Sequence, residues 1–268
     1  MTYTCAYCRF GVPYVGKEHG VSFSWLHGLE EFGPCPPNAD EATISCHFEV
    51  YLYALFGGVM FCNTAGDYVL PHLVWLARDI AMHPAEDTSY SWGSAVLAAT
   101  YRGLCDACQR SNANATLSGC LLLLQLWSWE YLPISRPRVA KSWYPKVINE
   151  HDPEDMRLTM GYRWTHATLR WAQEADHGNY KRVIADLDFL TEDDVTWYPW
   201  SADRAAEIAT GALISSYCTM DREWWMTTCF LLYMNNVEVY SPERVQRQFG
   251  YIQAVPVPDP RTAGHAHG

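Results

Sequence analysis

The chain has 268 residues, with 19 Lys and Arg against 30 Asp and Glu, which gives a formal net charge of −11. Because binding to a phosphate backbone relies on basic residues that displace its counterions, we expect no direct nucleic-acid binding. With 49% apolar and 18% charged residues, the chain is too hydrophobic for intrinsic disorder and long enough for a substantial core.

The first half of the chain reads as a loop-rich lead-in followed by helices. Glycine and proline interrupt residues 1–44 throughout. Apolar periodicity then predicts helices at 47–56, which Gly57 and Gly58 would stop, and at 70–80, 91–108 and 119–129. The most apolar of these, 119–129, is about half the ~20 residues that a bilayer requires, so we expect a core helix and no membrane partner.

The second half carries helix-start signals and little strand signal. We expect helices at 152–158, after the Asp152-Pro153 cap, at 191–197, after a capping-box variant, and at 203–214, 223–234 and 241–249. Alternation typical of strands occurs only at 66–70 and 237–240. The prediction is a mainly α fold, a single compact helical domain with at most one or two short β-hairpins. Its core would be 45–254, followed by a disordered tail at 255–268.

Cysteine spacing leaves a zinc site as the minor alternative. Cys5 and Cys8 form one C-x-x-C pair and Cys105 and Cys108 another, and four thiolates can hold zinc. The pairs are much farther apart than the roughly 15–20 residues of a zinc ribbon, so we expect unligated thiols. Ten cysteines in a chain of this length are far below the density of a secreted disulfide scaffold, which favours a reducing, intracellular compartment.

No catalytic motif is present. The chain lacks G-x-S-x-G, a Walker A sequence, G-x-G-x-x-G and H-E-x-x-H, so we assign no catalytic residue, metal or cofactor and expect no enzyme. The alternative is a metal-dependent phosphoryl-transfer or nuclease-like enzyme, for which acid density is the motivation. The acids concerned are Asp186, Asp188, Glu192, Asp193 and Asp194.

Tryptophan and arginine are the side chains that favour a binding surface. Of the 19 basic residues 15 are arginine, and the chain has 12 Trp. Both residue types dominate protein-interaction hot spots. We expect Trp197, Tyr198 and Trp200, at the end of a short predicted helix, to contact a protein partner. The tryptophans of the predicted apolar helices are expected in the core: Trp127, Trp129, Trp224 and Trp225.

Several blocks in order along the chain resemble the plant mobile domain, the domain of MAINTENANCE OF MERISTEMS-like and phosphatase 7 long form homolog proteins. These blocks are Leu-Phe-Gly-Gly-Val-Met-Phe at 55–61, Tyr-Ser-Trp-Gly-Ser-Ala-Val-Leu-Ala at 90–98, Tyr-Arg-Gly-Leu-Cys at 101–105, the Leu-rich run at 119–127, Trp-Glu-Tyr-Leu-Pro at 129–133 and Val-Gln-Arg-Gln-Phe-Gly at 245–250.

The resemblance implies a nuclear plant protein of a transposon-related family. Its members act in transposon and gene silencing, genome integrity and meristem maintenance, with a phosphatase-like partner. The family is also called aminotransferase-like, but a pyridoxal enzyme needs a Schiff-base lysine and nothing around the four lysines suggests one. Residues 1–30 match the family pattern poorly, and a missing N-terminal helix would expose an apolar face.

Overall fold

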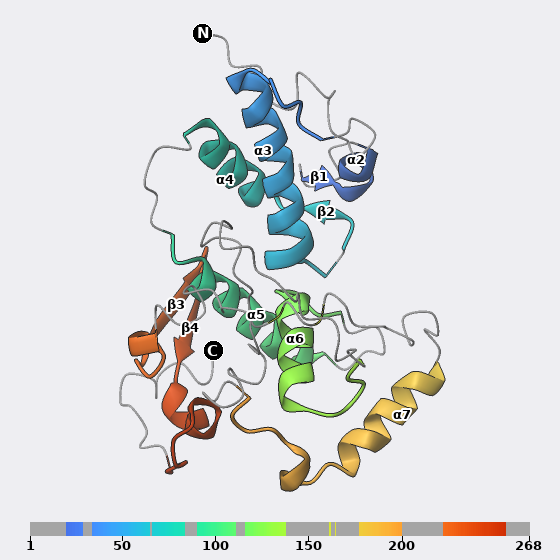
Figure 1. Cartoon of the computed structure of the whole chain (residues 1–268), viewed down its shortest axis with the longest axis vertical. Helices are drawn as coiled ribbons and strands as arrows, with labels where there is room; N and C mark the ends of the chain where they lie inside the picture. The colour runs from blue at the N-terminus through green and yellow to red at the C-terminus, as the bar shows by residue number, and fades with distance from the viewer. Residues whose placement is uncertain are drawn as a thin grey trace, which may run out of the picture. The chain divides into compact units, whose positions relative to one another are not determined.

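The computed structural model (Figure 1) describes residues 20–28, 34–64, 66–83, 90–110, 116–137, 161, 164, 177–199 and 222–255. It divides into two compact units. The first comprises Met1–Leu122 with Leu231–Glu238, and the second comprises Leu123–Phe230 with Val239–Gly268. The fold is mostly helical, as predicted, with two small two-stranded sheets. Among the described helices, none combines the length and the apolar character needed to cross a bilayer.

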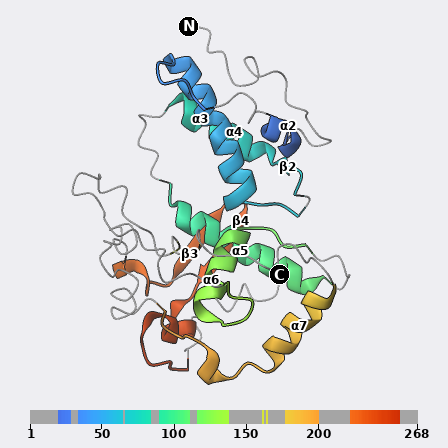
Figure 2. The same cartoon turned by 45° about the vertical axis from the view of Figure 1, so that its right-hand side comes forward.

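The first unit is built around two packed helices. α3 (Glu41–Leu55) lies beside α4 (Pro71–Met82) in both views (Figures 1 and 2). The core side chains between and around them include Leu52, Tyr53, Phe56, Leu73 and Ala77, each 7% exposed or less. Fully burying a side chain as large as Leu or Phe stabilises the fold by about 1.5–3 kcal/mol, so this cluster is the main stabilising element of the unit.

α3 begins earlier than the predicted 47–56. Asp40 caps it, because its Oδ1 accepts a hydrogen bond from the Thr43 backbone N–H at 2.8 Å, and Glu41 places an acid in the first turn, which the helix dipole favours. At the other end the backbone does not stop at the two glycines. It continues as a π-helix, η2 (Phe56–Met60).

The glycine at position 57 serves close packing. A Cβ there would lie 2.7 Å from Val69 Cγ2, so glycine lets β2 (Tyr68–Val69) approach η2. β2 pairs antiparallel with β1 (Val21–Ser22), with Val21 opposite Val69. β1 and α2 (Phe23–Gly28) lie where the sequence predicted only loops, and this part of the lead-in prediction was wrong.

α5 (Trp92–Gln109) and α6 (Leu121–Tyr131) match the predicted helices to within two residues. Thr100 links α5 to the segment before α6: its Oγ1 accepts from the Cys120 backbone N–H at 3.0 Å and donates to Val96 O at 2.7 Å. Gly119, at φ 104°, leaves no room for a side chain, because a Cβ there would lie 2.6 Å from Thr100 Cα.

In its described residues the second unit contains most of α6, then α7 (His177–Asp188) and 3₁₀ helices. These are η6 (Glu192–Asp194), η8 (Arg222–Trp224) and η9 (Pro242–Phe249). Trp129 of α6 is buried against Trp164, with ring centroids 5.2 Å apart, and Trp164 Nε1 donates to Glu130 Oε1 at 2.6 Å. Trp127 and Trp224, which were expected in the core, are instead 40% and 62% exposed.

The helix predicted at 223–234 was wrong. Only η8 is helical there, and the chain continues into β3 (Cys229–Tyr233), which forms a hairpin with β4 (Asn236–Tyr240). Leu231 is buried while its neighbours Phe230 and Leu232 are exposed, which is the alternation of a strand. The apolar run suits either period, and pairing with the correctly predicted strand at 237–240 selects the strand.

The remaining differences concern the second half of the chain. α7 is a helix that the sequence did not predict. The helices expected at 152–158 and 203–214 lie outside the described residues, as does the tail beyond Val255. The one-domain boundaries stay a prediction beside the two compact units. The helix at 241–249 is present as η9, which ends at Gly250 in the left-handed conformation (φ 81°), a geometry that glycine adopts without a Cβ penalty.

Candidate functional site

The segment that carries Trp197 is fixed by the predicted capping box. The Thr191 backbone N–H and hydroxyl both donate to Asp194 Oδ2, at 2.9 and 2.6 Å. The Thr191 hydroxyl, and then its backbone N–H, lower the pKa of the Asp194 carboxyl, because both bonds favour the charged form. The box starts η6, a 3₁₀ turn, where the sequence predicted a short capped turn, and it sets the direction in which the chain continues to Trp197.

Trp197 is held at the surface in a fixed orientation. Its indole Nε1 donates to Glu192 O at 3.3 Å, and the Cζ atom of Arg247 lies 5.3 Å from the centre of its ring. Arg247 also forms an ion pair with the Glu192 carboxylate. The guanidinium is therefore fixed by a carboxylate and an aromatic face together, which limits the side-chain entropy that an arginine loses when it binds a partner.

η9 brings a second arginine to the same side. The backbone of η9 is kinked at Val245 (φ −134°, ψ 37°), between the two arginines. Arg244 and Arg247, with Trp197 and Val255, line a groove of about 410 Å³. We name this site the Trp197 groove, and its remaining lining residues are Val245, Gln248, Gln253 and Ala254.

Tyr198, predicted beside Trp197 as a contact residue, is half-buried instead. Its ring packs on Gly250, where an added Cβ would lie 2.8 Å from a ring carbon. The next residue, Pro199, is buried, and Trp200 lies outside the described residues. Of the three predicted residues, Trp197 faces the groove and Tyr198 joins its η6 and η9 sides.

The groove has the composition of a protein-binding surface. Trp197 is 39% exposed, and Val255, which lines the same groove, is 92% exposed. Large apolar side chains beside arginine are the usual anchors of protein interfaces.

The acidic cluster serves other contacts. Asp186 and Asp188 are exposed on α7, Glu192 pairs with Arg247, and Asp194 caps η6. Cys105 and Cys108 are exposed thiols on α5, while Cys5 and Cys8 lie outside the described residues. Within the described ranges, no three His, Cys, Asp or Glu side chains are grouped to hold a metal ion.

Sequence reasoning missed Arg244, Arg247 and Glu192 as members of this site. The Arg-x-x-Arg spacing at 244–247 was readable, but the kink at Val245 between the two arginines was not. The contact between Arg247 and Glu192 joins residues 55 positions apart, and no local pattern predicts such a pair.

Comparison with known proteins gives consistent matches. Residues 16–266 match the plant mobile domain family. The chain is 34% identical over 251 residues to the serine/threonine-protein phosphatase 7 long form homolog of Arabidopsis thaliana. It is 30% identical over 237 residues to Protein MAIN-LIKE 1 and 27% identical over 239 residues to Protein MAINTENANCE OF MERISTEMS of the same plant.

These alignments cover most of the chain and a smaller part of each relative. They span 92%, 88% and 88% of this chain, but 18%, 40% and 42% of the three relatives in the same order. The chain thus spans less than half the length of these relatives. No solved structure matches it.

Proposed function

The chain belongs to the plant mobile domain family, and we propose from this premise that it is a non-enzymatic protein-interaction domain of a nuclear plant protein. In this proposal it acts, like the factors it resembles, in transposon and gene silencing, genome integrity and meristem maintenance. Its partner is a phosphatase-like nuclear protein.

The observation that carries the proposal is the Trp197 groove. An exposed indole lies under an arginine whose guanidinium is already fixed by Glu192, and the same groove is lined by Val255, which is more than nine-tenths exposed. Truncation of such tryptophan and arginine anchors commonly costs about 2 kcal/mol or more of binding free energy. The groove therefore suits a partner segment that buries an apolar side chain against Trp197 and Val255.

The relatives support the class of partner. One relative is named a phosphatase 7 long form homolog and another is named MAINTENANCE OF MERISTEMS. Similar sequence therefore occurs in a protein with a phosphatase-like name and in a protein with a developmental name. A domain that binds a phosphatase-like protein would account for both names. The absence of hydrolase and nucleotide-binding motifs from the sequence favours docking over catalysis in this chain.

The experiment is capture of partners from plant nuclei with the tagged chain and with two variants. Trp197→Ala removes the groove's aromatic anchor. Trp75→Ala is the matched control, because Trp75 is 68% exposed and also lies under an arginine, with Arg78 Cζ at 5.6 Å from its ring. We expect Trp197→Ala to lose a partner that the wild type and Trp75→Ala both retain, by about tenfold or more.

Either of two results would contradict the proposal: the Trp197→Ala variant folds and retains every partner, or both variants lose the same set. Circular dichroism of each variant establishes that the fold is intact before capture.

A further inference from the structure

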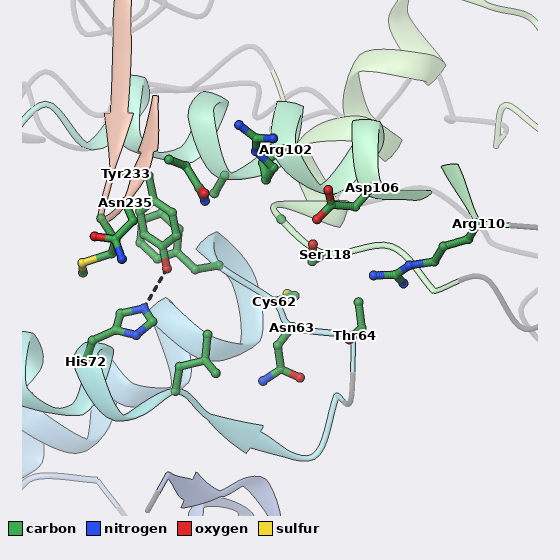
Figure 3. Close-up of a pocket in the computed structure, with 16 residues that line it drawn as sticks. Cys62, Asn63, Thr64, His72, Arg102, Asp106, Arg110, Ser118, Tyr233 and Asn235 are labelled. Atoms are coloured by element: carbon green, nitrogen blue, oxygen red, sulfur yellow. Dashed lines mark hydrogen bonds between the residues drawn. The ribbon is translucent and has the colours of Figure 1, made fainter. Parts of the chain in front are cut away.

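A pocket in the first unit has no part in the Trp197 groove. Its volume is about 530 Å³, within the 300–1,000 Å³ usual for small-molecule sites. Its walls come from α4, α5, the segment after η2 and the turn of the β3–β4 hairpin (Figure 3).

One end of the pocket is aromatic and uncharged. Phe61 and Tyr233 stack with centroids 4.4 Å apart and planes 11° from parallel, and His72 Nε2 lies 3.1 Å from Tyr233 Oη. Burial lowers the pKa of His72 and raises the pKa of Tyr233, so both rings are neutral at pH 7. This end suits an apolar or aromatic group of a ligand.

Special backbone geometry builds two of the walls. Phe61 and Cys62 directly follow the π-helix η2. π-helical turns are rare in proteins as a whole, but those that occur often lie at functional sites. Opposite them, Gly103 of α5 lets Ser118 approach, since a Cβ at position 103 would lie 2.1 Å from Ser118 O. Such close packing makes this wall rigid and holds Ser118 and Gly119 at the pocket.

The other end carries two opposite charges, those of Asp106 and Arg110. Arg102 and Asp106 lie four apart on α5 and share a face of it, Arg110 directly follows the last residue of α5, and all three line the pocket. Arg102 is neutralised by Glu238, with Nε and Oε1 2.8 Å apart. Arg110 Nη1 donates to Thr116 O at 2.8 Å, and the guanidinium offers five N–H donors in all. Asp106 and Arg110 project toward the cavity in Figure 3.

The balance of charge selects the ligand class. A phosphate group held by Arg110 would also lie near the Asp106 carboxylate, and the two negative charges would repel each other. A zwitterion satisfies both side chains. The smallest common zwitterion with an apolar extension is a free α-amino acid.

We propose that this pocket binds a free amino acid with an apolar or aromatic side chain. Its α-ammonium group donates to Asp106, its α-carboxylate accepts from Arg110, and its side chain points toward Phe61 and Tyr233. The inference is independent of the Trp197 groove, because it concerns other residues in the other unit.

The test is calorimetric titration of the full chain with L-phenylalanine, L-leucine and L-tryptophan. The variants are Asp106→Asn and Arg110→Gln, and the matched controls are Asp186→Asn and Arg182→Gln, which change exposed residues of α7. We expect saturable binding by the wild type and both controls. Each pocket variant should bind about tenfold or more weakly, the usual effect of losing a charged hydrogen bond.

Ligand analogues make the assignment specific. N-acetyl-L-phenylalanine lacks the ammonium group, so it should bind weakly to the wild type and lose nothing further in Asp106→Asn. L-phenylalaninamide lacks the carboxylate and should behave in the same way toward Arg110→Gln. No saturable binding of the three amino acids at about 10 mM, equal binding by the pocket variants, or tighter binding of adenosine monophosphate than of any amino acid would each overturn the proposal.

Discussion

Thr100→Val is the most informative perturbation of the first unit. Valine has nearly the shape of threonine but no hydroxyl, so the buried Cys120 N–H loses the acceptor that lies 3.0 Å away. Val96 O loses one donor but keeps the hydrogen bond of the helix itself. A buried donor left without a partner costs about 1–3 kcal/mol.

A thermal melt measures this cost. For a unit of this size, about 2 kcal/mol corresponds to a fall in Tm of about 5–10 °C. The control is Thr100→Ser, which keeps the hydroxyl and loses one methyl group, at a cost of about 1 kcal/mol. Hydrogen exchange at the Cys120 amide should be faster in the valine variant than in the serine variant.

The reasoning is refuted if Thr100→Val is as stable as the wild type, or if the serine variant is the less stable of the two. Either result would mean that packing of the methyl group, and not the hydroxyl, holds the segment before α6 on α5.

Three further predictions concern the two units. Gly250→Ala should lower the Tm by more than Gly66→Ala. Both positions have positive φ, which costs a non-glycine residue about 1–2 kcal/mol. Only at Gly250 would the new Cβ also clash with a ring, that of Tyr198. The capping box should weaken at acid pH. Because the folded pKa of Asp194 is lowered, its contribution is present above the unfolded value near pH 4 and is lost as pH falls through the folded value. An NMR titration should move the Thr191 amide resonance in the wild type but not in Asp194→Asn. Finally, Gly103→Ala should destabilise the packing of α5, because the new Cβ would lie 2.1 Å from Ser118 O. The control is Gly93→Ala, whose Cβ would meet nothing within 4 Å. We expect a lower Tm for Gly103→Ala than for Gly93→Ala.

Local signals accounted for most helices. The apolar periods at 70–80 and 91–108 predicted α4 and α5 nearly to their ends. Asp40 was a readable cap for α3, although the pattern was taken to begin later. The prediction at 223–234 failed because this apolar run is a strand only through its pairing with β4. No helix was predicted at 177–188, although Tyr180, Val183, Ile184 and Leu187 recur there at the spacing of an apolar helix face.

In both sites, contacts between residues close in sequence could be predicted and contacts between residues far apart in sequence could not. Trp197 and the capping box before it could be predicted, because both depend on neighbours in the chain. Arg102, Asp106 and Arg110 also have a regular spacing in the sequence, but the opposite end of the pocket brings His72 to Tyr233, 161 positions later. Contacts of that separation follow from tertiary packing, and one sequence does not specify them.

Site-specific photo-crosslinking shows directly whether the Trp197 groove contacts a protein partner. A photoreactive amino acid replaces Val255 in the Trp197 groove, and in a control chain it replaces Ile44, which is 52% exposed in the first unit. We expect irradiated plant nuclei to yield one dominant crosslinked protein, phosphatase-like, from position 255 and not from position 44, and we expect Trp197→Ala to abolish it. Equal crosslinking from both positions, or a product that Trp197→Ala leaves unchanged, would contradict it.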